Sequence, residues 1–344
     1  MKERDNASRE LRTLAVKPPK GSKLQIKRFL NAVCFASAAG LISGCVATST
    51  RLVADPISNL NGRLVSERVS AGSWMRHVNG DSRLIYVSDW GSNDVTVYDS
   101  DAQVVGEIAS LGGPEGLFVD QNHDLWVANS NQADVLEFAR GGTSPIRTLK
   151  DPMTRPDDLT ICPDKTIYVS NAGEGPGSGN IAVYPAGKTS PVRTLSSLGV
   201  NSNDWITCDA AGNVFSMVVI GSAVPTVGVI EYLNGREAHQ RGLAIEIQYP
   251  GGIKSETNGD LLITDGRTVT EYTEAGAPTG RSILTPFFAE DIAVSKDGSV
   301  AGGTGIHLAR SWTFPGGKLR RNFKDENPPS TSMPSGFAFD PEQL

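Results

Sequence analysis

Carboxylate and amide side chains recur at the ends of short apolar segments along this chain. Glu115, Asp157, Asn203 and Glu290 stand where such segments begin, and Asp265 stands where one ends. Oxygen ligands of this kind bind hard cations, and Ca²⁺ takes roughly six to eight of them. If the fold brings these five side chains together, they form a site for Ca²⁺ or Mg²⁺ or for a substrate. The alternative is that they cap strands and close turns, where Asp and Asn are common.

A catalytic base has one weak candidate. The chain contains four histidines, and only His307 lies near the same set of segment ends. A positioned histidine can transfer protons in catalysis, whereas a single unpaired histidine is more often structural. The sequence contains no Ser/His/Asp arrangement, zinc-ligand spacing, phosphate loop or dinucleotide fingerprint.

These polar residues belong to a repeat. A turn, an apolar segment, a second turn and another apolar segment follow one another several times, and the second segments begin at positions 84, 125, 167, 214, 261 and 300. A further alternating segment that ends in an aromatic residue follows most of them, for example 181–184. Repeats of about 40 to 50 residues with four short strands each are typical of a β-propeller. We therefore expect an all-β, six-bladed propeller.

The first repeat lacks a good first segment, and the C-terminal end of the chain contains one. Residues 334–340 have the pattern of a first segment and no partner of their own. We expect Phe337-Ala338-Phe339 to pair beside Leu84–Ser88, so that the C-terminal strand closes the ring. Closure removes open sheet edges, which otherwise aggregate.

Two motifs resemble a known class. Gly113-Pro114-Glu115-Gly116-Leu117 and Tyr86-Val87-Ser88-Asp89 are similar to motifs of NHL-repeat six-bladed propellers and, more distantly, of the gluconolactonase and senescence-marker-protein group. The resemblance covers about residues 84–344 and is specific for the fold. One fold hosts many functions, so it implies little about function.

The resemblance also implies site residues. Gluconolactonase-like enzymes use a Glu/Asn/Asp set to hold a metal that polarises a lactone carbonyl, and by position Glu115, Asn203 and Asp265 correspond to it. Streptogramin-inactivating lyases, which are also propellers, use a histidine for which His307 is the counterpart.

The N-terminal region resembles a bacterial lipoprotein signal. A basic stretch with nine Lys/Arg and three Asp/Glu over residues 1–28 precedes an uncharged apolar stretch, 29–44, and then Cys45. Leu41-Ile42-Ser43-Gly44-Cys45 resembles a lipobox, in which the cysteine is lipidated. An ordinary signal peptide or a core helix is the alternative. We expect a signal peptide at 1–44, a lipidated flexible tether at 45–70 and the propeller at 71–344.

Charge and cysteine content restrict partners and compartment. From residue 45 onward the chain holds 23 Lys/Arg and 35 Asp/Glu, a net charge of −12 that would repel nucleic acid.

Cys162 and Cys208 stand at equivalent positions in neighbouring repeats. We expect two buried free thiols, because equivalent positions on adjacent inner strands are expected to lie too far apart for a bridge. A disulfide is the alternative.

Together these observations predict an exported, lipid-anchored protein of the cell envelope, at the outer membrane or facing the periplasm. We expect it to be a monomer. We expect it to bind an unidentified protein or small-molecule ligand. The alternative is a metal-dependent lactonase-like hydrolase or a lyase at the mouth of the propeller channel.

Overall fold

The computed structural model describes residues 72–77, 82–151, 155–173, 177–221, 225–324 and 332–340. All of them belong to the second of two compact units, Ser66–Leu344. The expected signal peptide, the tether and Cys45 lie outside the described residues. Within these residues, no helix has the length and apolarity needed to cross a membrane.

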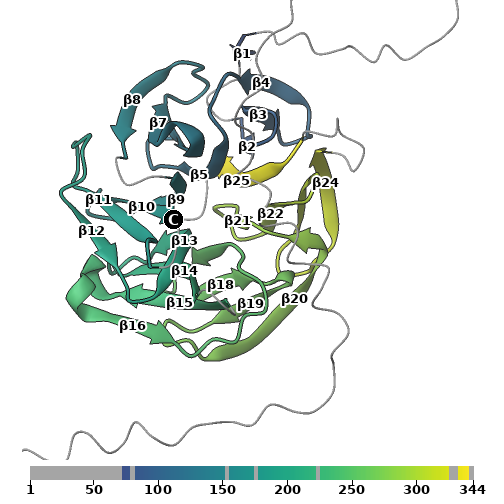
Figure 1. The fold of residues 1–344 in the computed structure, drawn as a ribbon. Coiled ribbons are helices and arrows are strands. Elements are labelled where there is room, and N and C mark those ends of the chain that lie inside the picture. The colour runs from purple at the N-terminus through teal and green to yellow at the C-terminus, as the bar shows by residue number, and fades with distance from the viewer. Residues whose placement is uncertain are drawn as a thin grey trace, which may run out of the picture. The chain divides into compact units, whose positions relative to one another are not determined.

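The described part of the chain is all-β, as predicted, with three single-turn 3₁₀ segments. These are η1 (Ser130–Gln132), η2 (Leu233–Gly235) and η3 (Glu237–His239). The strands pair antiparallel into four-stranded groups that follow the repeats, and Figure 1 shows them arranged around a centre. We number the groups one to six in the order of their second strands.

Each group runs outward from an inner strand. Inner strands, for groups one to six, are β25 (Pro334–Asp340), β5 (Pro114–Val119), β9 (Arg155–Ile161), β13 (Val200–Cys208), β17 (Ile253–Ser255) and β21 (Ala293–Val294). Second strands are β2 (Leu84–Asp89), β6 (Leu125–Asn129), β10 (Ile167–Ala172), β14 (Val214–Ile220), β18 (Leu261–Thr264) and β22 (Val300–Gly305).

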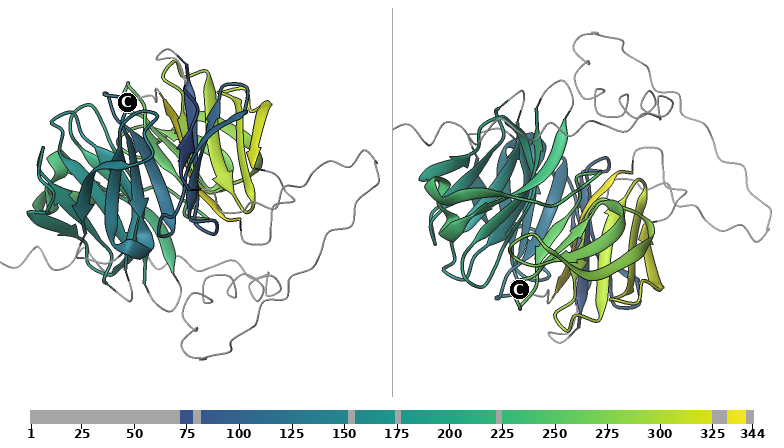
Figure 2. Two further views of the ribbon diagram at one scale, coloured as in Figure 1. Left: turned by 90° about the horizontal axis from the view of Figure 1, so that it is seen from above. Right: turned by 90° about the horizontal axis from the view of Figure 1, so that it is seen from below.

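The outer half of each group completes the sheet, and Figure 2 shows the groups from two further sides. Third strands are β3 (Asp94–Asp99), β7 (Asp134–Phe138), β11 (Asn180–Tyr184), β15 (Thr226–Tyr232), β19 (Gly266–Tyr272) and β23 (Leu308–Thr313). Outer strands are β4 (Val104–Ile108), β8 (Pro145–Lys150), β12 (Arg193–Ser196), β16 (Gln240–Leu243), β20 (Pro278–Ala289) and β24 (Leu319–Lys324), and β1 (Trp74–Met75) pairs outside β4.

The C-terminal strand completes group one, as the repeat predicts. β25 pairs antiparallel with β2, and Phe337 lies opposite Val87. Phe337 and Phe339 are buried, and they pack in one cluster with Ala293 and Ala309 of group six. A strand from the end of the chain therefore joins the first group to the last.

Groups three and four are more closely joined than the others. β10 forms one residue pair with β13, Ala172 with Ser202, so these two groups form a single continuous sheet.

The core lies between neighbouring groups, which explains the composition of the strands. β2 is buried along its whole length because it lies inside its sheet and has a neighbouring group on each face. Packing is tight enough to require glycine at one contact, because a Cβ atom on Gly302 would lie 2.2 Å from the ring of Phe337.

Candidate functional site

Four carboxylates converge at the starting ends of the inner strands. Glu115 is the second residue of β5, Asp157 lies near the start of β9, Asp204 lies in β13, and Glu290 precedes β21. These strands surround the centre in Figure 1. All four side chains remain partly accessible, so they line an opening rather than a dry core. We call these four residues the rim.

Burial raises the pKa of all four rim carboxylates, and neighbouring negative charges add to the rise for Glu115 and Asp157. Burial raises the pKa of Glu115 to about 8, and the negative charges of Asp204 and Glu290 add to the rise. Burial, Glu115 and Asp204 hold the pKa of Asp157 well above its ordinary value. Burial raises the pKa of Asp204 to about 6 and also raises that of Glu290. Side chains that start in different repeats therefore form one electrostatic group, as the sequence predicts for Glu115, Asp157 and Glu290.

Two rim neighbours were not predicted. Arg155, the first residue of β9, lies close enough to lower the pKa of Glu115, Asp157 and Asp204. Its Nε is buried and has no hydrogen-bond partner. Tyr249 donates from its hydroxyl to Glu290 Oε1 at 3.3 Å. The sequence signal for both was their place just before or within an inner segment, but nothing in it showed which way they point.

Beneath the rim lies a second acidic layer that ties the inner strands together. Asp158 Oδ2 accepts a hydrogen bond from the Ile206 amide at 3.1 Å, and Asp291 Oδ2 accepts one from the Phe337 amide at 2.9 Å. Burial raises the pKa of Asp158 to about 7 and that of Asp291 to about 6, while the charge of Lys254 opposes both shifts. These two carboxylates fit the alternative interpretation, in which acidic residues stabilise strand ends.

The remaining predicted residues have separate surroundings. Asn203 is fully buried in β13, where its Nδ2 donates to Ser216 Oγ at 3.2 Å and its Oδ1 has no partner. Asp265 closes the turn between β18 and β19, because its Oδ1 accepts from the amide and the hydroxyl of Thr268, at 3.0 and 2.7 Å. His307 lies in the turn between β22 and β23, with its Nδ1 against the Ser332 carbonyl oxygen.

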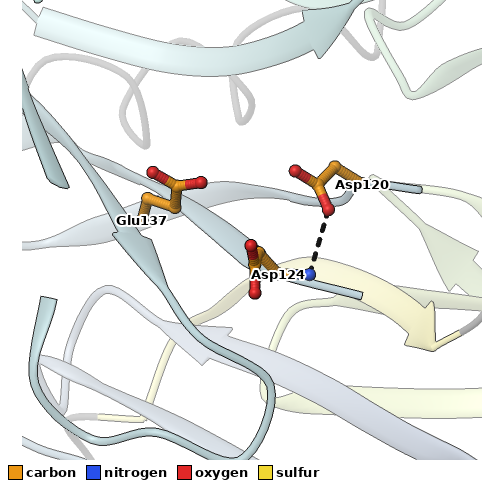
Figure 3. Close-up of side chains that lie close together, drawn as sticks. All are labelled: Asp120, Asp124 and Glu137. Atoms are coloured by element: carbon orange, nitrogen blue, oxygen red, sulfur yellow. Dashed lines mark hydrogen bonds between the residues drawn. The ribbon is translucent and has the colours of Figure 1, made fainter. Parts of the chain in front are cut away.

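One compact acidic group lies elsewhere. Asp120, Asp124 and Glu137 place ligand atoms within 4.8 Å of one another, the one such group among the residues that the structure describes (Figure 3). Asp120 accepts from the Asp124 amide at 3.0 Å, and Glu137 pairs with Arg147 at 2.6 Å. A turn and an ion pair account for this group. No three of the rim carboxylates meet this distance, so their present side-chain positions suit a ligand larger than one bare ion.

The expectation of two free thiols is wrong. Cys162 and Cys208 form a disulfide with a Cα–Cα distance of 5.5 Å. The two residues stand just after β9 and at the end of β13, strands whose groups are joined in one sheet. The distance lies within the usual range of about 4.4–6.8 Å. The repeat pattern contains no distance between neighbouring inner strands, so the separation of the two cysteines could not be derived from it.

Comparison by sequence gives no relative. No family model matches the chain, and no curated protein matches it.

Comparison by structure identifies β-propellers. The chain is similar to a structure of the nidogen/laminin complex (TM-score 0.58, 13% identity, 76% of this chain and 98% of that one). It is also similar to a protein of unknown function from Bacteroides caccae (TM-score 0.55, 15% identity, 75% of this chain and 98% of that one). A third similar structure is a gluconolactonase from Xanthomonas campestris (TM-score 0.52, 16% identity, 68% of this chain and 92% of that one). At these identities the likeness shows the fold alone, and the fold is that of a propeller distantly related to such proteins.

Proposed function

We propose that this protein is an exported, membrane-anchored six-bladed propeller that binds a small cationic ligand at the rim. The six strand groups are its blades, and β25 closes the ring. The observation that carries the function is the convergence of Glu115, Asp157, Asp204 and Glu290 from four groups.

A cation fits the rim because the carboxylates repel one another. Burial and the charges of Asp204 and Glu290 raise the pKa of Glu115 to about 8, so this carboxyl holds a proton at neutral pH. Burial and its neighbours also raise the pKa of Asp157. A bound positive charge favours the ionised form of nearby carboxylates and relieves that repulsion. Arg155 supplies one such charge from the protein, and its unpartnered Nε leaves a donor for a polar group of the ligand.

The nature of the cation follows from the spacing. The rim is wider than the Asp120 group, which favours an organic ammonium group or a hydrated Ca²⁺ or Mg²⁺ over a tightly coordinated ion. Mg²⁺ in particular commonly keeps several of its waters.

An enzyme is the second candidate. The carboxyl of Glu115, whose pKa is about 8, is protonated at neutral pH and can donate a proton to a substrate. Carboxylates with shifted pKa values in a cleft are typical of catalytic sites, although structural clusters share the property. Similarity to a gluconolactonase fold suggests the substrate class to test, a small lactone.

Calorimetric titration separates these functions. The purified protein is titrated with Ca²⁺, with Mg²⁺ and with 1,4-diaminobutane, and δ-gluconolactone hydrolysis is followed with and without each metal. Binding of any of the three cations, lost in Glu115→Gln/Asp157→Asn and retained in the exposed control Glu246→Gln, supports the proposal. Metal-dependent hydrolysis lost in the same double variant favours the enzyme. Absence of cation binding at millimolar concentration refutes the rim site.

A further inference from the structure

A cavity of about 380 Å³ opens at the other end of the inner strands, away from the rim. Small-molecule sites in proteins commonly measure ~300–1,000 Å³, so the cavity is large enough for a small organic ligand. Its walls come from groups two to five. The lining residues that matter here are Asp120, Arg147, Ile161, Cys162, Lys165, Cys208, Asp209, Ala210 and Lys254.

The walls of the cavity are held in place by cross-group bonds. The Cys162–Cys208 disulfide links groups three and four on one wall. The Ser255 amide of group five donates to Thr207 Oγ1 of group four at 3.1 Å. A preformed cavity binds a ligand without first losing conformational freedom of its own, which favours affinity.

The acidic residues of the cavity wall, Asp120 and Asp209, already accept hydrogen bonds from neighbouring residues. Asp120 accepts hydrogen bonds from the Asn122 and Asp124 amides, at 2.8 and 3.0 Å, and from Trp126 Nε1 at 3.2 Å. Asp209 accepts from the Ala211 amide at 2.9 Å and from the Asn213 amide at 2.8 Å. Both carboxylates serve their own turns, so little of their hydrogen-bonding capacity faces the cavity.

Among the basic residues of the wall, Lys165 differs from Lys254 and Arg147, whose charges already face carboxylates. Lys165 is exposed at the turn between β9 and β10, and in the described part of the chain its side chain has no ion pair. Lys254 reaches the inner end of the cavity, where Asp158 and Asp291 lie close enough to interact with it. Arg147 stacks over Trp126, with its guanidinium 4.5 Å from the ring centre, and pairs with Glu137.

Three basic side chains thus surround one cavity in a body whose net charge is −12. Ile161, Ala210 and the disulfide give the same cavity an apolar side. We propose that it is a second ligand site, for a small organic anion whose charged group faces Lys165 and whose apolar part lies against Ile161 and the disulfide. This site is independent of the rim.

Three carboxylate probes test the proposal: 4-phenylbutyrate, octanoate and benzoate, each titrated calorimetrically into the full protein. The neutral amide of 4-phenylbutyrate is the reference ligand. We expect at least one carboxylate to bind about tenfold more tightly than the amide, which would correspond to one well-placed charge interaction. Lys165→Gln should weaken that binding by a similar factor, and Ala210→Trp should abolish it by filling the cavity.

Two control variants keep the result specific. Lys318→Gln removes an exposed lysine of group six, and Glu115→Gln alters the rim, so both should bind the probe as the unmodified protein does. The proposal is wrong if no probe binds at millimolar concentration, if the amide binds as tightly as the acid, or if Ala210→Trp leaves binding unchanged. A loss in Glu115→Gln alone would assign the anion to the rim instead.

Discussion

The Ser88 hydroxyl donates a hydrogen bond of 2.5 Å to the main-chain carbonyl oxygen of Glu115, so the second strand of one group holds the inner strand of the next. The same oxygen of Ser88 accepts from the Gly336 amide at 2.7 Å, which ties in the closing strand as well. The relationship recurs around the centre. The Ser170 hydroxyl donates in the same way to Asp204, and the Thr304 hydroxyl to Ser335. Thr264 donates to Ala289, the last residue of β20, just before the inner strand of group six.

Removing this hydroxyl should destabilise the protein. Ser88 is fully buried, so Ser88→Ala leaves the Gly336 amide without its partner, at a cost of about 1–3 kcal/mol in unfolding free energy. Denaturant unfolding measures the loss. Ser92→Ala, at a neighbouring exposed position, is the control and should change little. Equal stability of the two variants would show that the cross-group bond contributes nothing.

The raised pKa values of the rim predict the pH dependence of stability. Folded Glu115 keeps its proton up to a pKa of about 8, whereas the unfolded chain loses it near the ordinary value of 4.5. Between these values the folded state binds more protons, so the free energy of unfolding falls as pH rises. Glu115→Gln removes this contribution and should melt higher than the unmodified protein at pH 9, with little difference at pH 4. If the melting temperatures of Glu115→Gln and the unmodified protein differ by the same amount at every pH from 4 to 9, the pKa shift is contradicted.

The disulfide should contribute substantially to stability. It closes a loop with a sequence separation of 46, for which the chain-entropy model gives about 4 kcal/mol. Cys208→Ser, or reduction of the unmodified protein, should lower the free energy of unfolding by an amount of this order. A reductant that leaves the melting temperature unchanged, while thiol titration shows the bridge to be open, would rule out this contribution.

Lipidation at Cys45 remains a prediction from the sequence. Each buried CH₂ of a lipid chain contributes roughly 0.8 kcal/mol to membrane binding, so two or more chains anchor a protein firmly. Cys45→Ser should release the protein or leave its precursor unprocessed. Cell fractionation and gel migration provide the measurement. A variant that fractionates and migrates like the unmodified protein would exclude the lipid anchor.

Most of the strand framework was predictable because it depends on local patterns. The apolar run 84–89 and the unpartnered segment 334–340 each have a pattern that fits one place in a ring, and they do pair. The convergence of Glu115, Asp157 and Glu290 followed from that ring alone.

The rest depends on geometry that the repeat does not encode. Arg155 and Lys254 lie close enough to the inner carboxylates to lower their pKa values, whereas Asp265 accepts a hydrogen bond from Thr268. The Cα–Cα distance of 5.5 Å that allows the disulfide is likewise a property of the assembled sheet.

The central claim, a cation site at the rim, is tested most directly by counting protons released on binding. Calorimetric titration of Ca²⁺, Mg²⁺ or 1,4-diaminobutane at pH 7, in two buffers of different ionisation enthalpy, gives that count. The account predicts net proton release, because Glu115, with a pKa of about 8, is protonated before the cation binds and ionises when it does. The raised pKa of Asp157 acts in the same direction. Release should disappear in Glu115→Gln/Asp157→Asn and persist in Glu246→Gln. Binding with no proton release, or release that survives in the double variant, would contradict a rim site.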